Sequence, residues 1–259
     1  MIHSSGSISG VNKNLTFSGA GVIVIDDAIS LGSGGVTLSG NPVVYLQHAN
    51  TFTGNIALYG GVLAPYANDA LGDSGSTNKI TFLGGAVRHY STNTSELFAR
   101  FNVPTSGYAW GIDPGNFTIN YNEGLGETFT GTNVGFSVFG SLGISGSNGS
   151  YSLQPSSSGT VVFDTTHLYT GTTTLRGGSN TTLLLSTLPG SGRDIVVKGG
   201  ILDLNSQTTG VMNSITIGGD TQNVAGSATG QNASLPNGTI KANTYNFNPG
   251  YYATDTITG

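Results

Sequence analysis

The sequence predicts an all-β fold, a β-solenoid of about a dozen coils that forms a single domain over residues 1–259. Three features predict this fold. The 42 glycines interrupt every long helical pattern, apolar residues alternate in short runs, and Gly-Gly pairs recur at a near-regular spacing. Because glycine permits tight corners, and because threonine and valine suit a half-buried pleated surface, a stack of short strands joined by corners is expected.

Composition narrows the class of protein further. Only 8% of the residues are charged, against roughly 25% in ordinary soluble domains, and 36% are hydrophobic, too many for a disordered tail. A surface of threonine, serine and asparagine suits a long-lived extracellular protein. The net charge is −5 and the 8 basic residues are scattered singly, so no nucleic-acid partner is expected. The longest aliphatic run, at residues 22–25, predicts no membrane span, and the lack of cysteine excludes disulfides.

One unit recurs along the chain: an alternating strand, a Gly-Gly pair and a second short strand. Copies lie at residues 56–63, 80–87, 195–202 and 215–219, and the glycine pairs recur at intervals of about 19 to 24 residues. This spacing is typical of a solenoid, in which each coil rests on the one before. Alternate residues of each strand are expected to face the core, as in Ile56 with Leu58 and Ile215 with Ile217, while their neighbours face solvent.

A longer repeat is superimposed on this unit. The segment 50–61 matches the segment 167–178 at an offset of 117 residues. This match predicts two super-repeats, at roughly 15–90 and 150–220.

The middle of the chain departs from the repeat. Residues 97–140 are rich in phenylalanine and tyrosine and contain the single tryptophan, so we expect a wider region whose aromatic side chains fill an expanded core. Just before it, residues 94–100 predict one or two helical turns, with Thr94 or Ser95 as the cap.

The repeat units resemble the autotransporter-associated β-strand repeat of bacterial surface proteins. The resemblance is carried by Asn50 to Gly54 with Gly60-Gly61, by Tyr169 to Leu175 with Gly177-Gly178, by Ile195 to Leu204, by Ile215 to Gly219 and by Ser18 to Val24. It covers most of the chain and is weakest between residues 98 and 149. It implies a right-handed parallel β-helix that is exposed outside a bacterial cell. The family shares no catalytic residues, so none are transferred to this chain.

Parallel β-helices include enzymes that degrade polysaccharides, so the carboxylates need to be considered. The candidates are Asp26, Asp27, Asp194, Asp203, Glu123 and Glu127. Adjacent Asp26 and Asp27 would point to opposite faces of a strand, so they are expected to end that strand at a turn and not to form a catalytic pair. A glycosidase or lyase site would also need arginine or lysine on adjacent coils, which is possible only if Arg176, Arg193 or Lys198 converges with Asp194. The histidines lack metal-ligand spacing, and we expect no enzyme, no metal and no cofactor.

Both ends of the chain have the pattern of further coils. Alternation is present at residues 7–18 and persists at residues 244–259, so neither end predicts a cap. The hypothesis is that the last coil of one subunit pairs with the first coil of the next and gives a head-to-tail homopolymer. The predicted self-assembly residues are Ile8, Leu15, Phe17, Tyr251, Tyr252 and Ile257. A fragment of a longer repeat protein would show the same ends.

These features predict an extracellular structural protein of a bacterial cell surface or matrix that self-associates into a filament. One alternative is a monomeric adhesin or carbohydrate-binding passenger, with a cell-surface or matrix polysaccharide as its partner and with Tyr108 and Trp110 as stacking residues. A third reading is a polysaccharide-degrading β-helix enzyme, which requires a groove where aspartate meets arginine or lysine.

Overall fold

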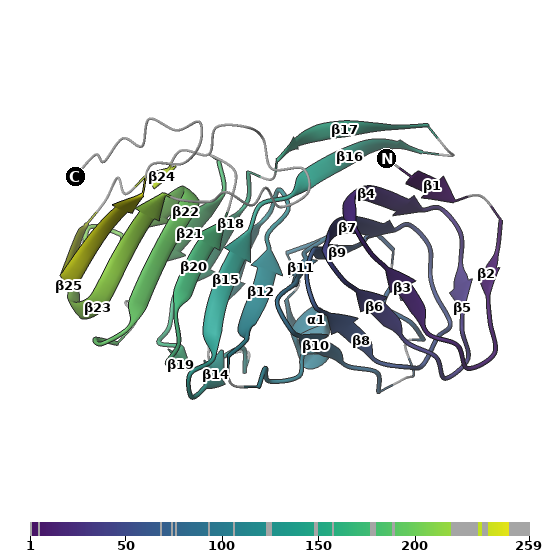
Figure 1. Ribbon diagram of the computed structural model, residues 1–259, viewed down its shortest axis with the longest axis horizontal. Coiled ribbons are helices and arrows are strands. Elements are labelled where there is room, and N and C mark those ends of the chain that lie inside the picture. Colours follow the sequence, from purple (N-terminus) through teal and green to yellow (C-terminus); the bar gives the residue numbers. More distant parts are fainter. Residues whose placement is uncertain are drawn as a thin grey trace.

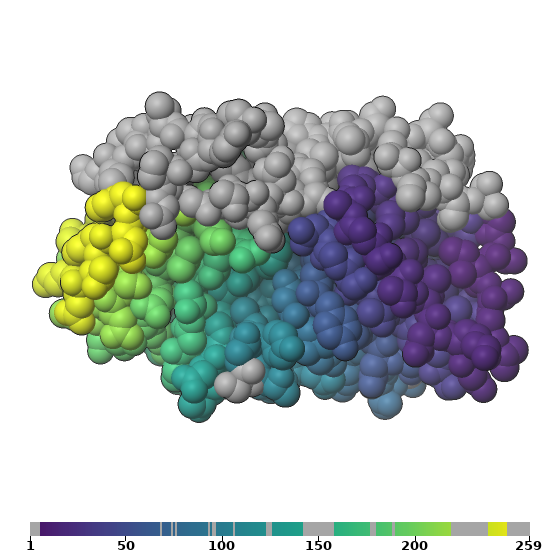
Figure 2. All heavy atoms as spheres, viewed as in Figure 1, coloured from purple at the N-terminus to yellow at the C-terminus, as the bar shows by residue number. Residues whose placement is uncertain are grey.

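A computed structural model describes most of the chain. It covers residues 2–4, 6–67, 69–73, 75, 77–92, 94–105, 107–122, 126–147, 150–156, 158–176, 180–187, 190–218, 233–234 and 238–248. The fold is all-β, and its parallel strands stack into a β-solenoid, which confirms the predicted fold class. The solenoid axis follows the long dimension of the molecule, with the first strands at one end and β25 at the other (Figure 1). In the space-filling view, the sequence colours succeed one another in bands along this axis (Figure 2).

The solenoid makes about eight turns, not the dozen predicted. That prediction assumed that every turn has the same length, whereas the observed turns differ. Val43 pairs with Val62 in the next turn, but Phe136 pairs with Thr173, which lies almost twice as far along the chain. The long turn contains an antiparallel hairpin, β16 and β17, which consumes chain without adding a turn. The number of turns therefore depends on insertions and not only on length.

The main sheet runs the whole length of the solenoid, and its strands pair in parallel. In spatial order they are β1 (Ile2–Ser4), β4 (Ala20–Ile25), β7 (Asn41–Leu46), β9 (Val62–Pro65), β11 (Ala86–Arg88), β12 (Ala109–Asp113), β15 (Gly135–Phe139), β20 (Thr173–Arg176), β22 (Asp194–Asp203), β23 (Thr208–Gly218) and β25 (Thr239–Asn248).

Shorter ladders form the other sides of the solenoid. One consists of β3 (Leu15–Phe17), β6 (Val36–Leu38), β8 (Ile56–Leu58) and β10 (Ile80–Phe82). Another joins β13 (Thr118–Tyr121), β18 (Thr160–Phe163), β21 (Thr182–Leu185), the second half of β22 and β24 (Ala233–Ser234). Two small pairs are β2 (Ile8–Ser9) with β5 (Ile29–Ser30), and β14 (Thr130–Gly131) with β19 (Leu168–Tyr169). The lateral hairpin consists of β16 (Leu142–Ser147) and β17 (Ser150–Ser156).

The core is formed as the alternation predicts. Ile56 and Leu58 are buried and the alanine between them is half-buried, and Ile215 and Ile217 are likewise buried around a half-buried threonine. The glycine pairs stand at corners, and Gly61 (φ 70°) and Gly200 (φ 96°) adopt the left-handed conformation that other residues avoid.

A column of glycines marks where successive turns approach most closely. A Cβ atom on Gly60 would lie 2.1 Å from the carbonyl oxygen of Gly40, and one on Gly111 would lie 2.0 Å from that of Gly85. Contacts this short do not occur between real atoms, so these positions exclude every side chain. The turns can therefore stack at the spacing of a β-sheet only because the column is glycine.

Asparagine side chains add a second set of links between turns. Asn14 Oδ1 accepts a hydrogen bond from the N–H of Gly35, and Asn55 Oδ1 accepts one from the N–H of Lys79. Buried Asn50 connects three turns, because its Oδ1 accepts from the N–H of Ile29 while its Nδ2 donates to the carbonyl of Ala70. These amides satisfy backbone groups at corners where the ladder is interrupted.

The aromatic-rich middle region forms the predicted cluster. The ring of Trp110 lies 5.3 Å from that of Phe129, and Phe82 and Phe101 meet edge to face at 4.8 Å. Beside this cluster lies α1 (Ser95–Ala99), the helix predicted at residues 94–100. Thr94 occupies the N-cap position but makes no capping bond, because its hydroxyl donates to Glu127 Oε1. Within the described residues, no helix is long and apolar enough to cross a membrane.

The two copies of the long sequence repeat occupy different sides of the solenoid. Strand β8, in the first copy, belongs to the four-stranded ladder, whereas β20, in the second copy, lies in the main sheet. The sequence repeat therefore encodes a short strand in both copies. The same sequence pattern lies on two different sides of the solenoid, and its position around the axis is set by the turns that precede it.

Candidate functional site

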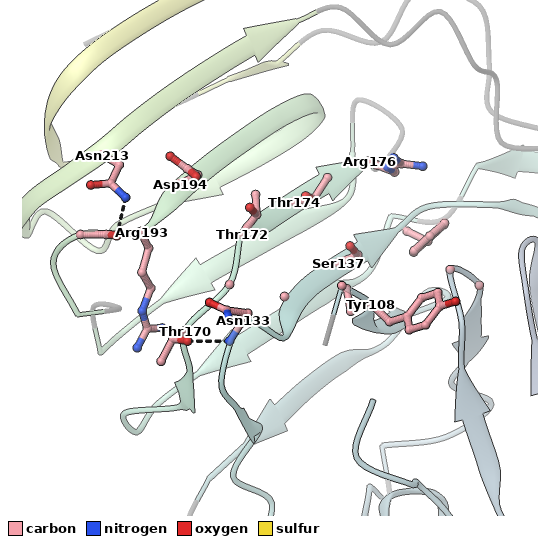
Figure 3. Close-up of a pocket in the computed structure, with 18 residues that line it drawn as sticks. Tyr108, Asn133, Ser137, Thr170, Thr172, Thr174, Arg176, Arg193, Asp194 and Asn213 are labelled. Atoms are coloured by element: carbon pink, nitrogen blue, oxygen red, sulfur yellow. Dashed lines mark hydrogen bonds between the residues drawn. The ribbon is translucent and has the colours of Figure 1, made fainter. Parts of the chain in front are cut away.

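A groove lies on the outer face of the main sheet, in the described part of the surface. It has a volume of about 580 Å³ and spans successive strands from the corner before β11 to β23. Figure 3 shows its labelled side chains, with Ser137, Thr172 and Thr174 on the floor and Tyr108 near one edge.

The floor is hollow because small residues face outward on neighbouring strands. Ala109 pairs with Gly135 across β12 and β15, and Ser137 pairs with Thr174 across β15 and β20. None of these residues is larger than threonine. The inward residues of the same strands belong to the buried core, so the first outward positions of β12, β15 and β20 present short side chains and hydroxyl groups, while Phe139 and Arg176 follow at the ends of β15 and β20.

Charged residues stand around this polar floor. The guanidinium of Arg176 lies over the ring of Phe139 at 5.9 Å, and that of Arg193 lies over the ring of Tyr169 at 5.0 Å. Asp194 Oδ1 accepts a hydrogen bond of 2.7 Å from the hydroxyl of Ser214. In the described structure, Arg176 Nε and Arg193 Nη1 are buried and make no hydrogen bond. Buried N–H groups without a partner are rare in folded proteins, so each of these two guanidinium groups keeps an unused donor.

Of the two predicted stacking residues, one lies at the groove and one does not. Tyr108 lines the groove and is 37% exposed, but Trp110 is only 2% exposed and belongs to the aromatic core. Tyr108 precedes the strand that begins at Ala109, so strand alternation does not fix its direction, whereas Trp110 lies within that strand and points inward. The predicted platform of Tyr108 with Trp110 is therefore wrong, since Trp110 offers no face to a ligand.

The other predicted carboxylates have structural roles. Strand β4 ends at Ile25, and Asp27 Oδ1 accepts a hydrogen bond from the N–H of Gly6, as expected for a residue at a turn. Asp203 Oδ1 accepts from the N–H of Asn205 in a tight turn. Glu127 is buried and accepts from Thr94, while Glu123 lies outside the described residues. Of these carboxylates, only Asp194 lines the groove, whose lining also includes Arg176 and Arg193.

The first turn contains three of the predicted self-assembly residues. Ile8 in β2 and Leu15 in β3 are half-buried, and Phe17 in β3 is 8% exposed. Strands β1, β2 and β3 each pair on one side only among the described strands. Tyr251, Tyr252 and Ile257, the predicted residues of the last coil, lie outside the described residues.

At the opposite end, β25 leaves aromatic side chains open. Tyr245 pairs in register with Ile215, and Phe247 pairs with Ile217. The two isoleucines are 2% and 4% exposed, whereas Tyr245 and Phe247 are 50% and 54% exposed. The tyrosine hydroxyl donates to the carbonyl of Ile240, so its ring folds back over its own turn. Tyr245 and Phe247 thus occupy positions that are buried in the preceding turn, but at this end of the solenoid their side chains stay half-exposed.

The sequence patterns did not predict a buried network of charged residues. Arg88 and Asp113, on the adjacent strands β11 and β12, pair in register and are 3% and 0% exposed. Arg88 Nε lies 3.9 Å from Asp113 Oδ1, and Arg88 Nη1 donates to the hydroxyl of Tyr45 at 2.6 Å. The hydroxyl of Ser141, at the start of the lateral hairpin, donates to Asp113 Oδ2. Burial raises the pKa of Tyr45 well above its usual value, so its hydroxyl stays protonated.

Removing the acid of this network should destabilise the fold. Asp113→Ala leaves the buried Arg88 without its counter-charge, and we expect a loss of about 3–5 kcal/mol in the free energy of unfolding. Urea unfolding followed by circular dichroism measures it. Asp203→Asn is the matched control, because asparagine can keep the turn hydrogen bond to residue 205 and should change stability by less than about 0.5 kcal/mol. Equal stability of the two variants would refute the structural role of the ion pair.

Comparisons with known proteins leave the family open. No protein-family model matches the sequence, and no curated protein or solved structure matches the chain. The resemblance to the autotransporter-associated repeat therefore remains a prediction, whereas the β-solenoid fold is established.

Proposed function

We propose that this chain is an extracellular structural protein whose solenoid stacks end to end into a filament. The observation that carries the proposal is the open end of the core at β25, where Tyr245 and Phe247 are half-exposed in line with buried isoleucines. Covering these two rings with another turn would remove large apolar surface from water.

Strand direction favours head-to-tail contacts. Successive strands of the main sheet are parallel and follow one another along the axis, from β1 to β25. A second subunit placed beyond β25 in the same orientation would bring its β1 alongside in the parallel sense, which continues the sheet. Such a contact joins two different surfaces and does not close on itself, so it generates an open fibre.

The expected result is fibres whose length grows with protein concentration, seen by negative-stain electron microscopy and by sedimentation velocity. Phe247→Lys should abolish them, because a charge would be buried at the junction. Tyr59→Lys is the matched control, since Tyr59 is 57% exposed and lies away from both end turns. Monomeric rods at high concentration, or equal loss of fibres in both variants, would contradict the proposal.

The location outside the cell belongs to the same proposal. It is supported by the low charge and by the surface of threonine, serine and asparagine. If protease is added to intact cells, we expect it to cleave the protein. Full protection of the protein until the cells are lysed would contradict the proposed location.

The proposal contains no catalytic step. Asp194, Arg176 and Arg193 all line the groove, although Arg176 pairs with Gly199 and not with Asp194, so the shared groove, but not a converging pair, matches what a polysaccharide-degrading enzyme was expected to need. Glycoside hydrolysis uses two carboxyl groups, however, and Asp194 is the one carboxylate among the described residues that line the groove. The groove therefore favours binding over cleavage.

A further inference from the structure

We propose that the groove on the outer face of the main sheet binds a linear oligosaccharide that carries carboxylate groups. The groove lies on the side of the solenoid and not on its end face, so this inference is independent of end-to-end stacking. It rests on the shape of the floor, on the polar groups that line it and on two arginine nitrogen atoms without partners.

The shape of the groove suits an extended polymer. It is lined by the corner before β11 and by residues of five successive strands of the main sheet, from β12 to β23. At about 4.8 Å per strand, five steps give a length of about 24 Å along the solenoid axis. The floor consists of the face of the sheet and not of a free strand edge. A peptide could therefore not extend the sheet here, and the groove does not favour β-augmentation.

The floor presents hydroxyl groups at repeated intervals. Ser137, Thr172 and Thr174 are half-buried and lie on neighbouring strands or at their start, and Thr170 and Asn213 stand at the rim (Figure 3). Hydroxyl groups both donate and accept hydrogen bonds, so they match a ligand that itself displays many hydroxyls. A sugar ring above β15 and β20 can meet hydroxyl groups from both strands, because these strands lie next to each other in the sheet.

The charged groups specify an acidic ligand. Arg176 Nε and Arg193 Nη1 are buried without hydrogen-bond partners in the described structure, and both residues line the groove. Asp194 is the one acid among the described residues that line the groove, and it already accepts a hydrogen bond from Ser214. Two guanidinium groups against one carboxylate leave a local excess of positive charge in a chain of net charge −5. A carboxylate is the planar partner that a guanidinium binds best.

Tyr108 supplies a flat apolar face at one edge of the groove. Its side chain is 37% exposed, and a tyrosine presents an apolar ring together with a polar tip. A sugar ring has the same division between an apolar face and a polar rim. Tyr108 therefore replaces the buried Trp110 as the stacking residue.

Isothermal titration of the full chain with galacturonic acid hexamer tests the proposal, with glucose hexamer as the neutral probe. We expect saturable binding of the acidic hexamer that weakens at high salt, and at least tenfold weaker binding of the neutral one. Arg176→Gln should weaken binding of the acidic hexamer about tenfold. Tyr108→Ala should weaken both probes about tenfold, whereas Tyr108→Phe should bind as the parent chain does.

Lys13→Gln is the control for net charge. Lys13 is exposed and lies in the first turns, outside the groove, so its loss should leave binding unchanged. Circular dichroism spectra of the variants verify that each is folded. Three outcomes would overturn the proposal: no saturable binding of the acidic hexamer, equal affinity for the neutral hexamer, or equal effects of Arg176→Gln and Lys13→Gln.

Discussion

Replacing Gly111 with alanine should prevent the turns from stacking in the native register. The added Cβ would lie 2.0 Å from the carbonyl oxygen of Gly85 and 2.9 Å from the Cα of Ala86. Both atoms belong to the backbone of the adjacent turn, so no side-chain rotation can relieve the contact. Gly111 does not have a positive φ, so the substitution tests the clash and not the backbone conformation. We expect a loss of at least about 3 kcal/mol in the free energy of unfolding, measured by urea denaturation.

Gly190→Ala is the control for this prediction. The nearest atom to its added Cβ is Arg193 Nη2 at 3.5 Å, an ordinary contact with the end of a flexible side chain, and Gly190 is exposed. Its stability should change by less than about 0.5 kcal/mol. If Gly111→Ala unfolds at the same urea concentration as Gly190→Ala, the close approach of the turns is refuted.

Acid should destabilise the protein by about 4 kcal/mol between pH 7.5 and pH 5, because two histidines are buried in the neutral form. Burial lowers the pKa of His89 to about 3, and burial is also the main reason why the pKa of His167 falls to about 4. In the unfolded chain both titrate near 6.5, so the native state binds fewer protons below that pH. Their contribution is complete above about 6.5 and is lost as pH falls toward 4 and 3, at about 2 kcal/mol each by pH 5.

The geometry explains why these rings resist protonation. His167 Nδ1 accepts a hydrogen bond of 3.0 Å from the N–H of Phe129, and a proton on this nitrogen would remove that bond. Arg193 also lowers the pKa of His167 by repulsion between the two charges. The Nε2 atom of His89 is hydrogen-bonded to the hydroxyl of Tyr121 inside the core.

Urea unfolding at several pH values measures this effect. His89→Gln should remove about half of the loss between pH 7.5 and 5, whatever its effect at neutral pH, because it deletes one of the two titrating groups. His48→Gln is the control: the side chain of His48 is 55% exposed and lies near Asp26, and the pH dependence should not change. A variant without His89 that shows the full loss would exclude that histidine as the source.

Alternation and glycine spacing were sufficient to predict the β-solenoid and its inward residues, since both are local features of a strand. The groove was beyond such reasoning. Arg176 and Asp194 belong to different turns, and they line one hollow because β20 and β22 pair in a particular register. The ion pair of Arg88 and Asp113 could not be predicted for the same reason. A whole turn of chain separates these two residues in the sequence, although they pair on adjacent strands.

The sequence by itself determined the class of fold and the alternation of the core. It also placed glycine at the corners, because this follows from the backbone conformations that glycine permits. Only the tertiary structure decided the number of turns, the side of the solenoid on which each repeat lies and the burial of Trp110. These depend on the length of every preceding turn, and a hairpin such as β16–β17 changes the register of everything stacked after it. Local preferences act over a few residues, whereas register accumulates along the whole chain.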